Sequence, residues 1–133
     1  MRLALAQLNP LVGDLVGNAK SIQKACITAA SLKADILLTP ELSLWGYPPR
    51  DLLLKTLLLK QQEKTLNELA KFISKKTPQI VVLVGLAEKA ADKEMPKLFN
   101  SIALIDNEGW RVVARKQLLP TYDVFDEKRY FRP

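Results

Sequence analysis

The chain has 133 residues, 48% of them hydrophobic and 26% charged, a composition that suits one modest domain with a real core and argues against disorder. The formal net charge of +6 keeps nucleic-acid binding under consideration, although the basic residues are scattered along the chain. No apolar run approaches membrane-spanning length, and the absence of histidine excludes Ser-His and Cys-His nucleophile pairs and leaves only carboxylates as metal ligands.

Residues 3–8 alternate weakly between apolar and polar and predict a first strand, which Asn9-Pro10 ends. A helix is expected to begin at Asp14 or Asn18, both good N-cap residues, and to end at Leu32. Its apolar face is predicted to contain Ala19, Ile22, Cys26 and Ala29. Cys26 is the only cysteine, so we interpret it as a buried core thiol in a protein of the reducing cytosol.

Residues 35–39 predict a short buried strand, which Pro40 ends. A second helix is expected over about 51–74, ended by Thr77-Pro78. Its inward positions are predicted to be Leu59, Leu66, Leu69 and Ile73. Residues 80–85 are almost purely apolar and predict a strand that is buried on both faces.

A polar loop at 87–97 is expected to precede two strands, at 98–105 and 110–114. The residues between these strands, Asp106-Asn107-Glu108-Gly109, are typical of a hairpin turn, and residues 115–133 show no regular pattern. Helices that alternate with strands imply crossover connections, so the sequence predicts an α/β fold with a largely parallel sheet.

Two charged residues follow predicted strands: Glu41 after 35–39 and Lys116 after 110–114. If these strands are neighbours in one sheet, both side chains reach the same rim, where α/β proteins hold their chemistry. There, a glutamate can act as a general base and a lysine can stabilise an oxyanion, which together serve acyl transfer if a nucleophile joins them. The alternative is an ordinary surface ion pair, which the spacing alone favours.

The residues around Glu41 and Lys116 resemble two motifs of the nitrilase (carbon–nitrogen hydrolase) superfamily. Pro40-Glu41-Leu42 with Gly46-Tyr47-Pro48-Pro49-Arg50-Asp51-Leu52-Leu53 resembles its base-bearing motif. Residues 116–131, which begin Lys116-Gln117-Leu118-Leu119-Pro120, resemble its lysine motif. In these forms, both motifs are similar to the amino-terminal glutaminase domain of glutamine-dependent NAD synthetases, and the resemblance spans essentially the whole chain.

The resemblance implies roles for five residues. Glu41 would be the general base that takes the proton of a cysteine thiol, and Lys116 would hold the oxyanion of the tetrahedral intermediate. Tyr122 and Phe125 lie where the family contacts the glutamine substrate. Glu127 matches a second carboxylate that helps to position the site in many superfamily members.

The resemblance also implies the larger setting. The fold would be the first half of a nitrilase-like four-layer αββα sandwich, with 1–133 a partial glutaminase domain. The nucleophilic cysteine would come after the lysine motif, beyond Pro133, and Cys26 would not replace it. No cofactor or metal is expected in this chain, whereas ATP and magnesium would serve a separate synthetase domain that uses the ammonia to make NAD from nicotinic acid adenine dinucleotide.

The expected partners are glutamine, that synthetase domain and further copies of the protein, with no nucleic acid and no membrane. A single sheet of this kind would expose an edge and an apolar face, so poor solubility or self-association is expected. Three other interpretations stay open: an inactive fragment or interaction module, part of a stand-alone nitrilase-type amidase, and a nucleic-acid binder. The sequence of 122–131 argues against the stand-alone amidase, and the scattered lysines argue against the nucleic-acid binder.

Overall fold

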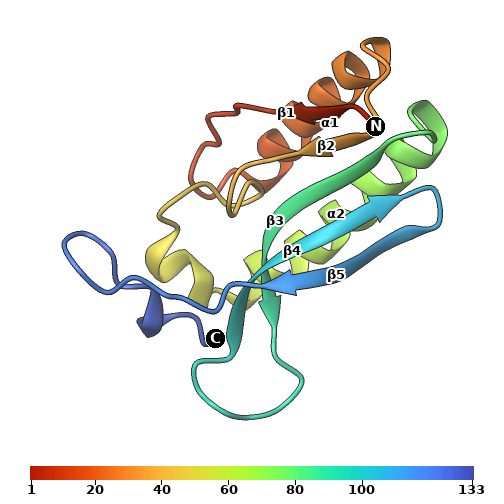
Figure 1. Ribbon diagram of the computed structural model, residues 1–133. Helices are drawn as coiled ribbons and strands as arrows, with labels where there is room; N and C mark the ends of the chain where they lie inside the picture. The colour runs from red at the N-terminus through yellow and green to blue at the C-terminus, as the bar shows by residue number, and fades with distance from the viewer.

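A computed structural model describes all of residues 1–133 and shows one five-stranded sheet with both α-helices on the same face (Figure 1). The strands are β1 (Leu3–Leu5), β2 (Ile36–Leu38), β3 (Val81–Lys89), β4 (Leu98–Asp106) and β5 (Gly109–Arg115). The helices are α1 (Leu15–Ser31) and α2 (Thr56–Lys76), with short 3-10 helices η1 (Arg50–Leu54) and η2 (Glu127–Arg129). The predicted α/β class and the order of its main elements are confirmed.

The strands lie side by side in chain order, and the sheet is mixed rather than largely parallel. β1, β2 and β3 pair in parallel, whereas β3, β4 and β5 pair antiparallel. The parallel pairs need crossover helices, which α1 and α2 provide, and the antiparallel pairs need only a loop and a tight turn. The predicted hairpin of β4 and β5 is confirmed, whereas the antiparallel pairing of β3 with β4 was not predicted and makes the sheet parallel only in its first half.

Several predicted boundaries were also wrong. The first strand ends at Leu5 rather than at residue 8, although the Ala6 amide still donates to the Leu38 carbonyl at 2.9 Å. The helix expected over 51–74 is divided at Lys55, whose extended backbone separates η1 from α2. β3 continues to Lys89, well into the predicted loop at 87–97.

The start of α1 shows how two nearby polar residues, Asp14 and Asn18, take different roles. Asp14 is the N-cap, because its side chain accepts a hydrogen bond from the Gly17 amide at 3.0 Å. Asn18, the alternative N-cap in the sequence, is buried instead. Its amide group donates to the carbonyls of Leu11 and Leu44, both at 2.9 Å, so it ties α1 to two loops.

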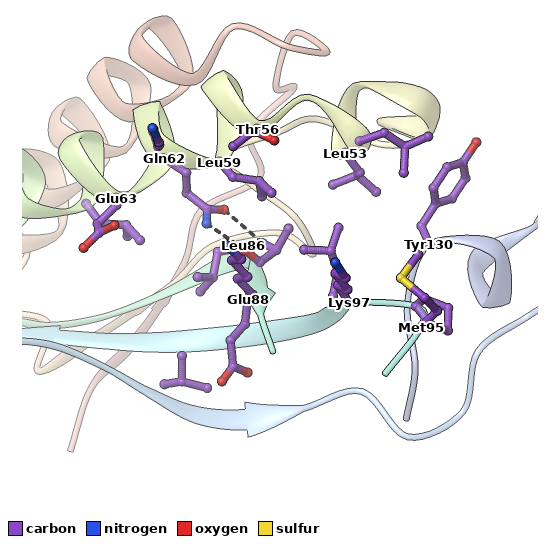
Figure 2. A pocket seen from close by; sticks show the side chains of 18 of the residues that line it. Leu53, Thr56, Leu59, Gln62, Glu63, Leu86, Glu88, Met95, Lys97 and Tyr130 are labelled. Atoms are coloured by element: carbon purple, nitrogen blue, oxygen red, sulfur yellow. Dashed lines mark hydrogen bonds between the residues drawn. The ribbon is translucent and has the colours of Figure 1, made fainter. Parts of the chain in front are cut away.

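The hydrophobic core lies between the two helices and the sheet. The four predicted core residues of α1 are all buried: Ala19, Ile22, Cys26 and Ala29. In α2, Leu66, Leu69 and Ile73 are fully buried, as predicted. Leu59 is only partly buried, because it lines a groove of about 740 Å³ between α2 and the sheet (Figure 2).

No helix or strand of this chain covers the other face of the sheet. Residues that pair across strands point to the same face, and here the pairs are apolar: Leu3 with Ile36 and Val81, then Leu5 with Leu38 and Leu83. Leu3 is 53% exposed and Leu5 is 67% exposed, while Val81 and Leu83 are half-buried. The expected apolar face is therefore present, and the prediction that the third strand is buried on both faces was wrong. No helix of this structure combines the length and the apolar character needed to cross a membrane.

Candidate active site

Glu41 and Lys116 meet, although the strands that they follow are not neighbours. Lys116 Nζ lies 2.8 Å from Glu41 Oε1. β3 and β4 lie between β2 and β5, so the two side chains do not meet through adjacent strands. The two groups meet because the loop after β2 crosses the open face of β3 and carries Glu41 toward β4 and β5.

Gly85 of β3 is the point at which this loop crosses. The Gly85 amide donates to Ser43 Oγ at 3.1 Å, and its carbonyl accepts from the Leu44 amide at 3.3 Å. A Cβ atom on Gly85 would lie only 2.3 Å from the Leu42 nitrogen. Glycine is required here because the backbone of the Glu41 loop rests directly on the strand.

Asn100, on β4, is a third member of the site. Its buried side-chain amide donates to Glu41 Oε1 at 2.6 Å, and its backbone carbonyl accepts from the Lys116 amide at 2.8 Å. Glu41 Oε1 thus accepts two hydrogen bonds, one from Asn100 and one from Lys116. Glu41 Oε2 accepts no hydrogen bond from the protein, so it is the oxygen that is available to accept a proton.

Glu127, at the start of η2, is the second carboxylate beside Lys116. Its side chain is only 4% exposed and lies 3.1 Å from Lys116 Nζ, and Glu127 Oε1 also accepts from the Tyr47 hydroxyl at 3.0 Å. Burial raises the pKa of Glu127, as does the nearby charge of Glu41, while the hydrogen bonds from Lys116 and Tyr47 oppose the rise. The structure therefore places a costly buried carboxylate against the lysine.

Lys116 is the shared partner of the two carboxylates. Burial acts to lower the pKa of Lys116, but its hydrogen bonds and charge interactions with Glu41 and Glu127 outweigh burial, so the net change is upward. The ammonium therefore stays charged at neutral pH. A fixed ammonium is suited to stabilising negative charge that develops on a bound substrate.

Tyr122 and Phe125 lie on the loop between Lys116 and η2 and belong to a row of aromatic rings. Phe125 packs against Tyr47 with the ring centroids 6.2 Å apart, and Tyr122 meets Phe125 edge-on at 5.5 Å. Tyr122 is the outermost ring and is 66% exposed. These two rings are connected to the site through Tyr47, which packs on Phe125 and donates to Glu127.

A cavity of about 320 Å³ adjoins the charged pair on the open face of the sheet. Its lining includes Glu41, Gly85, Asn100, Ala114 and Lys116. The larger groove under α2 contains neither Glu41 nor Lys116, so its greater volume does not make it the better candidate. The smaller cavity brings a base, an amide donor and a cation together at one point, which is the chemistry of an active site.

Cys26 lies outside the lining of this cavity. It is fully buried on α1, in the core on the helix-covered side of the sheet, and burial raises the pKa of its thiol to about 12. A thiol in that position is not an available nucleophile. No group of three or more His, Cys, Asp or Glu side chains is placed to hold a metal ion.

Sequence reasoning missed three contributors to this site. Asn100 and Gly85 stand in strand segments with no local signal of their role. Tyr47 falls within the first motif, yet the contact of its hydroxyl with Glu127 spans 80 positions of sequence. Trp45, which also follows Glu41 in the sequence, is fully buried, and its indole donates to Gln62.

The chain as a whole is similar to several known proteins. The family model for carbon-nitrogen hydrolases matches residues 2–133. A glutamine-dependent NAD(+) synthetase from Synechocystis sp. is 47% identical over 132 residues, which cover 97% of this chain and 23% of that protein. The chain thus spans about a quarter of the length of the curated relatives that it matches.

Solved structures agree with the sequence relatives. A glutamine-dependent NAD+ synthetase from Acinetobacter baumannii superposes with a TM-score of 0.82 at 34% identity, covering 98% of this chain and 23% of that one. A mutant of an amidase from Nesterenkonia sp. AN1 superposes with a TM-score of 0.72 at 26% identity, covering all of this chain and 49% of that one. In that amidase, acrylamide has added to the active-site cysteine.

Proposed function

This chain belongs to the carbon-nitrogen hydrolase family, and on that premise we propose that residues 1–133 supply the general base and the oxyanion-holding group of a glutamine amidase. The observation that supports this most strongly is the 2.8 Å contact between Lys116 Nζ and Glu41 Oε1 beside a cavity of about 320 Å³. A surface ion pair without a function would not need the buried Asn100 and Glu127 on its two sides.

In the proposed reaction, a cysteine thiol attacks the side-chain amide carbon of glutamine. Glu41 Oε2 takes the thiol proton, because Oε1 is already occupied by Asn100 and Lys116. Negative charge then develops on the carbonyl oxygen, and the Lys116 ammonium stabilises it. The proton returns to the departing nitrogen, ammonia leaves, and water hydrolyses the thioester to release glutamate.

We propose that the thiol comes from a polypeptide segment outside residues 1–133. The only cysteine of this chain is Cys26, which is buried on the other side of the sheet. The similar amidase from Nesterenkonia sp. AN1 has an active-site cysteine, which supports a nucleophile of this type. The open face of the sheet bears both the cavity and exposed apolar residues, so a segment that covers this face would also reach Glu41.

The wider role that we propose is to supply ammonia for the synthesis of NAD. Identity to glutamine-dependent NAD synthetases reaches 47% among sequence relatives and 34% among solved structures, compared with 27% for the amidase structure, which favours this role over that of a stand-alone amidase. ATP and magnesium would bind to a separate synthetase domain, which would amidate nicotinic acid adenine dinucleotide. Tyr122, Phe125 and Glu127 would line the path of glutamine to Lys116.

The test is ammonia release from glutamine by this chain, alone and mixed with the remaining part of the corresponding domain of the Synechocystis relative. We expect release only from the mixture, because Glu41 and Lys116 are in place and a nucleophile is needed. Release by the chain alone would overturn the assignment of Cys26 as a core thiol. If the two proteins are folded and form a complex but release no ammonia, the result would favour an inactive fragment or an interaction module.

A further inference from the structure

Two hydrogen bonds from tyrosine to carboxylate run in opposite directions between the loops that carry the two motifs. Tyr47, in the loop after β2, donates to Glu127 Oε1 at 3.0 Å. Tyr130, just after η2, donates back to Asp51 Oδ1 in η1 at 2.5 Å. We call this pair of contacts the tyrosine latch; its inner arm is Tyr47–Glu127 and its outer arm is Tyr130–Asp51.

We propose that Tyr47 is a positioning residue of the candidate active site: its hydroxyl holds Glu127 in place, and Glu127 in turn holds Lys116 beside Glu41. The catalytic meaning of this inference rests on the proposed function, whereas its geometry does not. The chain of contacts is continuous, with 3.0 Å from Tyr47 to Glu127, 3.1 Å from Glu127 to Lys116 and 2.8 Å from Lys116 to Glu41.

The two arms of the latch differ in burial, and this difference separates a positioning role from a purely structural one. The Glu127 side chain is 4% exposed, whereas the Asp51 side chain is 72% exposed. Water can replace the hydroxyl of Tyr130 at Asp51 but has little access to Glu127. Loss of the inner hydroxyl therefore leaves a buried carboxylate with Lys116 as its remaining side-chain donor.

The Glu127 carboxylate has only two side-chain hydrogen-bond donors, Tyr47 and Lys116, so loss of the Tyr47 hydroxyl should change its protonation. The charged and titratable groups that face it are Lys116, from the segment after β5, and Tyr47 and Glu41, from the loop after β2. Glu127 Oε2 accepts no hydrogen bond of good geometry, even though Lys116 Nζ is 3.1 Å away. Without the Tyr47 hydroxyl, Glu127 would bind its proton more tightly and would hold Lys116 less firmly beside Glu41.

The experiment is an NMR titration of this chain labelled with ¹³C at the glutamate carboxyl carbons and with ¹⁵N at the lysine side chains, the signals being assigned with Glu127→Gln and Lys116→Arg. Tyr47→Phe removes only the hydroxyl and keeps the ring against Phe125. Tyr130→Phe is the matched control, because it removes the same group from the outer arm. We expect Tyr47→Phe to raise the titration midpoint of Glu127 by about one pH unit and to move the Lys116 ammonium signal, and Tyr130→Phe to change neither.

An unchanged Glu127 midpoint in Tyr47→Phe, or an equal rise in Tyr130→Phe, would overturn the inference. If Tyr47→Phe fails to fold, the chain is labelled with 3-fluorotyrosine, whose more acidic hydroxyl is a stronger donor. The Glu127 midpoint is then expected to fall, and an unchanged midpoint would again refute the role of Tyr47. Neither readout depends on glutamine hydrolysis, so a failure of the proposed function is distinguishable from a failure of this inference.

Discussion

At the scale of single residues, two glutamates, one partly buried and one buried, differ in what surrounds them. Glu88 accepts two hydrogen bonds from the Arg115 guanidinium, at 2.6 and 2.7 Å, and one from Ser101 at 2.8 Å. The hydrogen bond from Arg115 lowers the pKa of Glu88 despite its partial burial. Burial dominates at Glu127 and raises its pKa. One carboxylate therefore stabilises the fold when ionised, and the other costs stability.

Glutamine substitutions at these two positions are predicted to have opposite effects. The contribution of Glu88 is present above its ordinary pKa of 4.5 and is lost as the pH falls through its lower folded value. The cost of Glu127 is absent below 4.5 and grows as the pH rises toward its higher folded value. At pH 7, Glu88→Gln should lower the free energy of unfolding and Glu127→Gln should raise it, as measured by urea denaturation.

Repetition of the denaturation near pH 4 is the control for this pair. Both differences should shrink there, because the carboxyl groups approach protonation in the unfolded chain. Shifts of the same sign for both variants at pH 7 would contradict this explanation. A gain in stability for Glu127→Gln would mean that this carboxylate is kept at the expense of stability, as functional groups often are.

Gly85→Ala tests the crossing of the Glu41 loop over β3. The added methyl group would lie 2.3 Å from the Leu42 nitrogen and 2.7 Å from the Pro40 carbonyl oxygen, so the loop must move. We expect a loss of about 1–3 kcal/mol in the free energy of unfolding and a displaced NMR signal of the Lys116 ammonium. Gly109→Ala is the control. Gly109 has a positive φ, but no atom beyond its chain neighbours lies within 4 Å of an added Cβ, so its substitution should leave the Lys116 signal in place. An unchanged signal in Gly85→Ala would refute the role of the crossing.

The residues of the site differed in how far the sequence could predict them. Glu41 and Lys116 were found because each stands in a motif, and Glu127 was found by resemblance. The role of Asn100 was not predicted, because its contact with Glu41 joins residues 59 positions apart. The same holds for the Tyr47 hydroxyl, whose partner depends on the path of a loop without regular structure.

At the scale of elements, the edge of β3 that pairs with β2 shows how the Glu41 loop is supported. β2 pairs only with Val81–Leu83 of β3, which leaves the rest of that edge without a strand partner. The Glu41 loop forms hydrogen bonds with the backbone of Gly85. The side chain of Gln62, which extends from α2 toward the sheet in Figure 2, forms hydrogen bonds with the backbone of Ala87. Gln62 Nε2 donates to the Ala87 carbonyl at 2.7 Å, while Gln62 Oε1 accepts from the Ala87 amide at 3.0 Å and from the Trp45 indole at 2.5 Å.

Gln62→Leu is predicted to be strongly destabilising. It would leave the indole of Trp45 and both backbone groups of Ala87 buried without partners, at a cost of about 3 kcal/mol in the free energy of unfolding. Gln61→Leu makes the same chemical change on an exposed position of the same helix and should change stability by about 0.5 kcal/mol or less. Equal effects of the two substitutions in urea denaturation would rule out this role of Gln62.

Periodicity predicted the elements better than their ends. The 3.6-residue pattern located the core faces of α1 and α2, because burial against the sheet dictates it. The break at Lys55 was missed because Leu52–Leu59 is rich in good helix formers, so its sequence favours helix while tertiary packing imposes η1. The extension of β3 to Lys89 was missed because its end is polar and is stabilised by Gln62 and by pairing with β4, not by an apolar pattern of its own.

At the scale of the whole molecule, the cavity and the apolar face lie on the same side of the sheet. Exposed side chains on or beside this face include Leu3, Leu5, Ile102 and Val113. A surface of this kind favours association. A segment that covers it would thus serve two purposes: it would bury apolar area and would exclude water from Glu41 and Lys116.

The chain alone is predicted to self-associate through this face. Leu5→Lys, at a position 67% exposed on the open face, should lower the average mass in sedimentation experiments over a range of concentrations. Ile27→Lys is the matched control, because Ile27 is 53% exposed on α1, on the opposite side of the molecule. A monomeric unsubstituted chain with a sharp, cooperative melt would show that the face needs no cover.

The central claim is that Glu41 and Lys116 act as one unit in the hydrolysis of glutamine, and a double-mutant cycle on ammonia release by the complemented chain tests it most directly. Glu41→Gln should reduce the rate by about 10²–10⁴-fold, and Lys116→Gln by about 10²–10³-fold. The double variant should be no slower than the slower single variant, because removing either of two groups that act as one unit already removes their joint effect. Losses that multiply, or rates that hardly change, would contradict the account.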